Sequence, residues 1–152
     1  MINASDLTEV ARTIQTALAP VFLLTGISGM LNVLSGRLGR VVDRARRLEH
    51  LYGETEGSEH NRHVAELRVL DRRITLVGDA IFLFVASAIT VSAVVALLFV
   101  AGLTGLHLAD VIAVTFVVSM LLMIAGLIKF SVEVRIAMRT VQVREEMLER
   151  DG

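Results

Sequence analysis

The feature that most constrains the fold of this chain is a pair of long runs without a charged side chain. Residues 13–36 form the first run, of 24 positions, and residues 80–106 form the second, of 27 positions. About 20 apolar residues let one α-helix cross the hydrocarbon core of a bilayer. A third apolar stretch occupies residues 110–130. The sequence therefore predicts an all-α integral membrane protein with three transmembrane helices.

Composition agrees with this prediction and narrows the classes of function. Hydrophobic residues make up 54% of the 152 residues, and the mean hydropathy of +0.66 exceeds the usual balance of soluble domains. The sequence contains no cysteine, so it offers no disulfide framework and no thiolate metal ligand. Its net charge of −1 favours no nucleic-acid partner. Arg12 is the only early cation, so we expect no cleaved secretory signal.

Turn residues and changes in polarity divide the chain into seven predicted segments. Residues 1–19 read as an amphipathic helix on the outer membrane face that meets the first span at Pro20. A plain N-terminal extension of that span is the alternative. The other segments are a first span at 20–36, a cytosolic helical hairpin at 37–76 with a turn at 52–58, a second span at 77–101, an outer loop at 102–109, a third span at 110–130, and a cytosolic helix and tail at 131–152.

The distribution of cations predicts the orientation in the membrane. Nine arginines lie in residues 37–76 and five cations in residues 129–152, whereas Arg12 stands alone in the predicted outer segments. Lysine and arginine are enriched in cytoplasmic loops, so the N-terminus is predicted outside and the C-terminus inside. The arginines next to the spans form a basic cytosolic collar that fits anionic headgroups of the lipid bilayer.

The cytosolic segments are predicted to pack as a three-helix stalk. The first segment has the alternating three- and four-residue spacing of a coiled-coil seam. The third segment has a seven-residue repeat at Val134, Val141 and Leu148. The seam of the first segment consists of Leu38, Val41, Ala45, Leu48 and Tyr52.

A helical wheel divides the first span into an apolar face and a face of small and polar residues. The second face covers about one third of the circumference. It contains the five pore-lining candidates Thr25, Ser28, Asn32, Ser35 and Gly39. Asp43 and Arg46 continue this face beyond the span, and with Arg40 they are the three candidates for a cytosolic vestibule.

Two interpretations of this face remain open. Small residues four positions apart let helices approach closely, with Asn32 bonded to a neighbouring helix. Alternatively, copies of the helix surround a water-filled path, because polar and small residues line pores. A homo-oligomer would serve both interpretations.

Ionisable residues near the spans are interpreted as structural ion pairs. Asp79 and Lys129 are expected at similar depth, where they can pair. Glu133 is expected near the level of Arg73 and Arg135. Such pairs more often hold helices together than carry protons, although buried charges within spans are also found at functional sites.

The sequence gives little indication of catalysis. It contains no Walker loop, dinucleotide fingerprint, nucleophile elbow or zinc-protease motif. His60 and His63 have one-turn spacing, but no further ligand converges on them. We therefore expect no enzyme activity, no cofactor and no metal site.

Three stretches of the sequence resemble a known family. They are residues 35–44 (SGRLGRVVDR), residues 72–74 (RRI) leading into residues 80–81 (AI), and residues 130–137 (FSVEVRIA), where Ser131 replaces a more usual leucine. They are similar to a bacterial membrane-protein family catalogued as domain of unknown function 2721, over residues 20–137. The resemblance implies a small multi-pass protein of the bacterial inner (plasma) membrane, and it supplies no activity.

Two functional hypotheses follow from these residues. The first is a homo-oligomeric inner-membrane pore for ions or small solutes, lined by the polar face of the first span. The alternative is a non-conducting scaffold or accessory subunit whose stalk binds a cytosolic protein partner.

Overall fold

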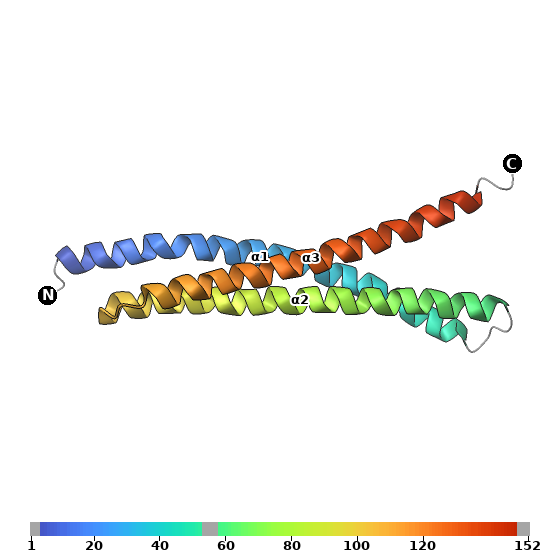
Figure 1. Cartoon of the computed structure of the whole chain (residues 1–152), viewed down its shortest axis with the longest axis horizontal. Coiled ribbons are helices and arrows are strands. Elements are labelled where there is room, and N and C mark those ends of the chain that lie inside the picture. The colour runs from blue at the N-terminus through green and yellow to red at the C-terminus, as the bar shows by residue number, and fades with distance from the viewer. Residues whose placement is uncertain (1–3, 53–57, 149–152) are drawn as a thin grey trace. The chain divides into compact units, whose positions relative to one another are not determined.

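The chain consists of three long α-helices. The computed structural model describes residues 4–52 and 58–148, with side chains described for most of residues 7–138. The helices are α1 (Ala4–Tyr52), α2 (Ser58–Thr104) and α3 (Ala109–Leu148), shown in Figure 1. Each contains a stretch long and apolar enough to cross a membrane, at Val10–His50, His63–Thr104 and Ala109–Met138. The prediction of an all-α fold with three helices long and apolar enough to cross a membrane is confirmed. The chain has the pattern of a multi-pass membrane protein.

The helix boundary predicted at Pro20 is absent. α1 continues through Pro20, so residues 4–19 are an N-terminal extension of the same helix, which was the alternative considered above. Proline lacks the N–H that would bind the carbonyl of Thr16, but its fixed φ is compatible with a helix. Membrane helices tolerate proline because side chains and neighbouring helices compensate for the lost bond. Pro20 is buried in the structure.

The connection between α2 and α3 is shorter than the predicted loop at 102–109. It comprises residues 105–108, and Gly102 lies within α2. Gly105 has a φ of 69°, and its N–H donates to the carbonyl of Ala101 over 2.9 Å. A left-handed glycine directly after a helix satisfies one of its last free carbonyls. α3 continues past residue 130, so the predicted third span and final helix are one element. Most of the predicted turn at 52–58 lies outside the described residues.

The chain forms two compact units, and each contains a segment of all three helices. The first unit comprises residues 1–32 and 83–124, and the second comprises residues 33–82 and 125–152. In the first unit, Ser87 Oγ donates to the carbonyl of Ser119 over 2.8 Å, which joins α2 to α3. The buried side chains of this unit include Ile27, Phe84 and Val91. A buried hydroxyl bonded to a backbone carbonyl is a common contact between membrane helices.

The core of the second unit joins α1 to α2. Val41, Ala45 and Leu48 of α1 form one buried cluster with Leu70 of α2, and Leu67 and Ile74 pack against it. These three α1 residues belong to the predicted seam, in which Leu38 is half-buried. The side chains of Tyr52, Val141 and Leu148 lie outside the described residues, so the coiled coil stays a prediction.

Candidate functional site

Charged residues of all three helices stand directly at the ends of the charge-free runs. Arg37 follows residues 13–36, Asp79 precedes the second run, and Lys129 follows residues 111–128. All three lie in the second unit. This unit therefore contains, for each helix, one of the positions at which its sequence changes from apolar to charged.

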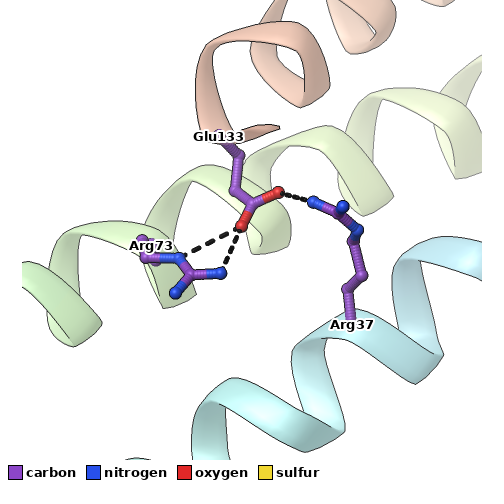
Figure 2. A network of polar contacts seen from close by, with 3 residues as sticks. All are labelled: Arg37, Arg73 and Glu133. Atoms are coloured by element: carbon purple, nitrogen blue, oxygen red, sulfur yellow. Dashed lines mark hydrogen bonds and ion pairs between the residues drawn. The ribbon is translucent and has the colours of Figure 1, made fainter. Parts of the chain in front are cut away.

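Glu133 is the centre of a three-residue ion-pair cluster. Figure 2 shows its carboxylate on α3 between Arg37 of α1 and Arg73 of α2. Arg37 Nη1 donates to Glu133 Oε2 over 2.5 Å, and Arg73 donates to Oε1 from Nη2 over 2.9 Å and from Nε over 3.2 Å. The Glu133 side chain is fully buried, whereas Arg37 and Arg73 keep 29% and 20% of their side-chain surface exposed. One carboxylate thus joins the three helices.

A ring contact adds to this cluster. The guanidinium carbon of Arg37 lies 5.4 Å from the centroid of the Phe130 ring, within the range of a cation–π interaction. Phe130 precedes Glu133 by three positions, and residues with this spacing share one face of a helix. α3 therefore contacts Arg37 through both a carboxylate and a ring, which fixes the guanidinium from two sides.

Two further ion pairs lie in the same unit. Lys129 Nζ donates to Asp79 Oδ2 over 2.8 Å, and both side chains are a little under half exposed. Arg44 donates to Glu66 Oε1 from Nη2 over 2.7 Å and from Nε over 3.0 Å. The first pair joins α2 to α3, and the second joins α1 to α2. Arg135 is exposed and is not part of the Glu133 cluster.

The polar face of α1 is exposed in the single chain, at every candidate residue that the structure describes. Among the described residues, the Asn32 amide has no hydrogen-bond partner. A Cβ added at Gly29, Gly36 or Gly39 would find nothing within 4 Å. The opposite face contains the buried Ile27 and Leu34. All five pore-lining candidates and all three vestibule candidates are exposed: Thr25, Ser28, Asn32, Ser35, Gly39, Arg40, Asp43 and Arg46.

The described part of the chain holds no group of three or more histidine, cysteine, aspartate or glutamate residues arranged to bind a metal ion. The two features that remain as functional candidates are the Glu133 cluster and the exposed polar face of α1.

Comparison with protein families matches residues 17–143 to the family described as "Protein of unknown function (DUF2721)". The chain belongs to this family. The resemblance inferred from three short stretches is therefore confirmed, and the match includes all of them. Comparisons with curated proteins and with solved structures found no match.

In this DUF2721 member, the three stretches that carry the resemblance meet at the Glu133 cluster. Arg37 lies in the first stretch, Arg73 in the second, and Phe130 and Glu133 in the third. The sequence placed Arg73 and Glu133 at one level but assigned no partner to Arg37. The signal in the sequence was the position of Arg37 directly after the charge-free run 13–36. Lys129 occupies the equivalent position on α3 and was expected to form an ion pair.

Proposed function

We propose that this protein assembles as a homo-oligomer in which the polar face of α1 lines a path for ions or small solutes. The observation that supports the proposal is the exposure of this entire face, from Thr25 to Arg46, while the opposite face of the same helix is buried. The Arg40, Asp43 and Arg46 side chains would then form a vestibule of mixed charge.

The cost of a polar side chain in hydrocarbon supports assembly. An amide without a hydrogen-bond partner costs several kcal/mol in an apolar medium, about 4–8 kcal/mol on the cyclohexane scale. Asn32 lies within the charge-free run 13–36 and is exposed in the single chain. Water in a shared path or an amide of a second copy would satisfy it. Three spans are few to enclose a path alone, so the proposal requires several copies.

A non-conducting scaffold or accessory subunit is the second candidate. It is supported by the length of helix that lies beyond the charge-free runs, since α1 continues from residue 37 to residue 52 and α3 from residue 129 to residue 148. Such extensions offer a charged surface for a protein partner. Under both candidates the protein performs no enzymatic reaction and needs no cofactor.

We further propose that the N-terminus lies outside and the C-terminus inside, in the inner (plasma) membrane of a bacterium. The helix segments beyond the predicted spans, residues 37–76 and 131–152, then form a cytosolic stalk with its basic collar at anionic headgroups. The cation count supports this orientation. The native sequence has no cysteine, so Arg12→Cys and Arg68→Cys each introduce a single thiol. In intact spheroplasts, a membrane-impermeant maleimide should label Arg12→Cys and spare Arg68→Cys until the cells are lysed. Labelling of Arg68→Cys in intact cells would reverse the proposed topology.

Flux through liposomes tests the pore. Purified protein in vesicles should conduct at least one class of small solute, and Asn32→Leu should reduce that flux severalfold while the oligomer stays intact on size exclusion. Val33→Leu is the matched control, because Val33 is the next residue on the same helix and is half exposed. It should leave the flux unchanged.

Two outcomes of these flux and assembly measurements would count against the pore. Wild-type vesicles that pass neither cations, anions nor neutral solutes would exclude the pore and leave the scaffold. Dissociation of the oligomer by Asn32→Leu would mean that Asn32 bonds to a neighbouring copy rather than to water.

A further inference from the structure

The first unit contains an open apolar groove of about 610 Å³ between its three helix segments. Pro20 of α1, Leu98 of α2 and Phe116 of α3 line it, and its polar lining residues are Thr16 and His107. Its volume lies in the usual range of ligand pockets, about 300–1,000 Å³. The groove can therefore hold a ligand that is apolar over most of its length.

The sequence around the groove places it in an apolar medium. Its lining residues belong to runs in which no Asp, Glu, Lys or Arg occurs, namely residues 13–36, 80–109 and 111–128. Apart from the connection at residues 105–108, these runs lie within the candidate membrane spans, in which the surrounding solvent consists of lipid acyl chains. An apolar groove that stays empty loses dispersion contacts along its walls. An acyl chain is the ligand that this setting supplies.

Arg12 lies one helical turn before a lining residue of the groove, and His107 is a lining residue. Arg12 is the only lysine or arginine in residues 1–32 and 83–124. It precedes Thr16 by one helical turn, so both lie on the same face of α1. The Thr16 hydroxyl donates to the carbonyl of Arg12 over 3.0 Å. His107 lies in the exposed connection between α2 and α3, and it is itself a lining residue.

One acidic residue, Asp110, follows this connection closely. Asp110 lies in the first turn of α3 but is not among the residues that line the groove. The neighbouring lining residue Ala109 is about 100° away around the helix.

We propose that this groove binds one acyl chain of an anionic phospholipid, whose phosphate contacts Arg12 and His107. The apolar walls contribute most of the contact area, and the two basic side chains select an anionic headgroup. The site is separate from the polar face of α1 and does not depend on conduction.

Fluorescence quenching by brominated lipid tests the proposal directly. The chain has no tryptophan, so Phe116→Trp introduces a single reporter with a conservative change. Phe22→Trp is the matched control: Phe22 is 72% exposed and follows the lining residue Pro20 by two positions, so its depth is similar. Full-length protein carrying either reporter is placed in phosphatidylcholine vesicles that contain a small fraction of phosphatidylglycerol or phosphatidylcholine with brominated acyl chains.

The expected result is a preference for the anionic lipid at the groove alone. Phe116→Trp should show an apparent binding constant for brominated phosphatidylglycerol about fivefold above that for brominated phosphatidylcholine, the usual contribution of one basic residue at an anionic membrane surface. Phe22→Trp should show no preference. Adding Arg12→Gln or His107→Gln to the Phe116→Trp chain should lower the ratio of the two binding constants toward a value of one.

Three results would overturn the proposal. Equal quenching by the two lipids at Phe116→Trp would exclude selection of the headgroup. A preference that survives Arg12→Gln and His107→Gln together would exclude these two side chains as the phosphate contacts. Absence of quenching by both lipids at Phe116→Trp, with normal quenching at Phe22→Trp, would mean that protein fills the groove instead.

Discussion

Two ion-pair sites of the second unit link α1 to the other helices, and they differ in burial. At the Arg44–Glu66 pair, the side chains keep 48% and 36% of their surface exposed. At the Glu133 cluster, the carboxylate has no exposed surface and contacts arginines of two different helices. The shortest contacts are similar, at 2.7 Å for Arg44–Glu66 and 2.5 Å for Arg37–Glu133. Contact distance therefore does not distinguish the two sites.

The difference between the two sites predicts different consequences of losing a charge. An exposed pair can exchange its partner for water, so its net contribution to stability is small, about 0–1 kcal/mol. A buried carboxylate has no water to replace a lost arginine. Loss of the carboxylate, in turn, leaves both arginines without a counter-charge at this site. Removing one member of a buried pair costs about 3–5 kcal/mol. Burial, rather than the number of ion pairs, should decide which charges hold the helices together.

The largest expected effect comes from Glu133→Gln, which removes the charge and nearly preserves the volume. Arg37 and Arg73 are then left facing each other without a counter-charge. We expect the free energy of unfolding to fall by about 3 kcal/mol, at the lower end of the range for buried pairs because both arginines remain partly exposed. Denaturant titration in detergent micelles, followed by circular dichroism, measures this change.

Replacing the whole cluster sharpens the same comparison. In the variant Arg37→Met/Arg73→Met/Glu133→Leu, no charge is left without a partner, and apolar groups of similar size replace the buried ions. Such replacements are often neutral or stabilising. Most of the stability lost in Glu133→Gln should therefore return. A triple variant that is less stable than Glu133→Gln would show that the ion pairs themselves, rather than the avoidance of unpaired charge, stabilise the unit.

The smallest expected effect comes from Glu66→Gln at the exposed pair. Here the free energy of unfolding should fall by less than about 1 kcal/mol, and the difference from the wild type should shrink further in high salt. The same titration, repeated at two ionic strengths, measures both quantities. If Glu66→Gln destabilised the protein as much as Glu133→Gln, burial would not be what separates the two sites.

Much of the fold was predictable because membrane crossing imposes a simple rule on sequence. A helix that crosses hydrocarbon needs about 20 apolar residues, and residues 13–36 and 80–106 satisfy this directly. The position of Pro20 was harder to interpret, since proline both ends helices and occurs inside membrane helices. Only the path of α1 distinguishes the two. The connection between α2 and α3, residues 105–108, was predicted too long, because Gly102 does not end α2.

The sequence predicted the depth of the charged residues along the helices, but not which of them form ion pairs with one another. Counting from the ends of the charge-free runs put Asp79 near Lys129 and Glu133 near Arg73, because rise along a helix is fixed at about 1.5 Å per residue. The partners of a charge also depend on how each helix is rotated about its axis. Arg37 was expected among the arginines of the membrane boundary, and its side chain instead reaches Glu133 and the Phe130 ring.

The sequence by itself determined that this chain has three stretches apolar enough to span a membrane, where their charge-free runs end, and that α1 has one apolar and one polar face. These properties follow from composition and helical periodicity, which are local. Only the tertiary structure decided that the apolar face of α1 is the buried one, that Arg37 and Arg73 share one carboxylate, and that the first unit contains an apolar groove. Each of these depends on the rotation and separation of helices far apart in the chain, and packing sets both.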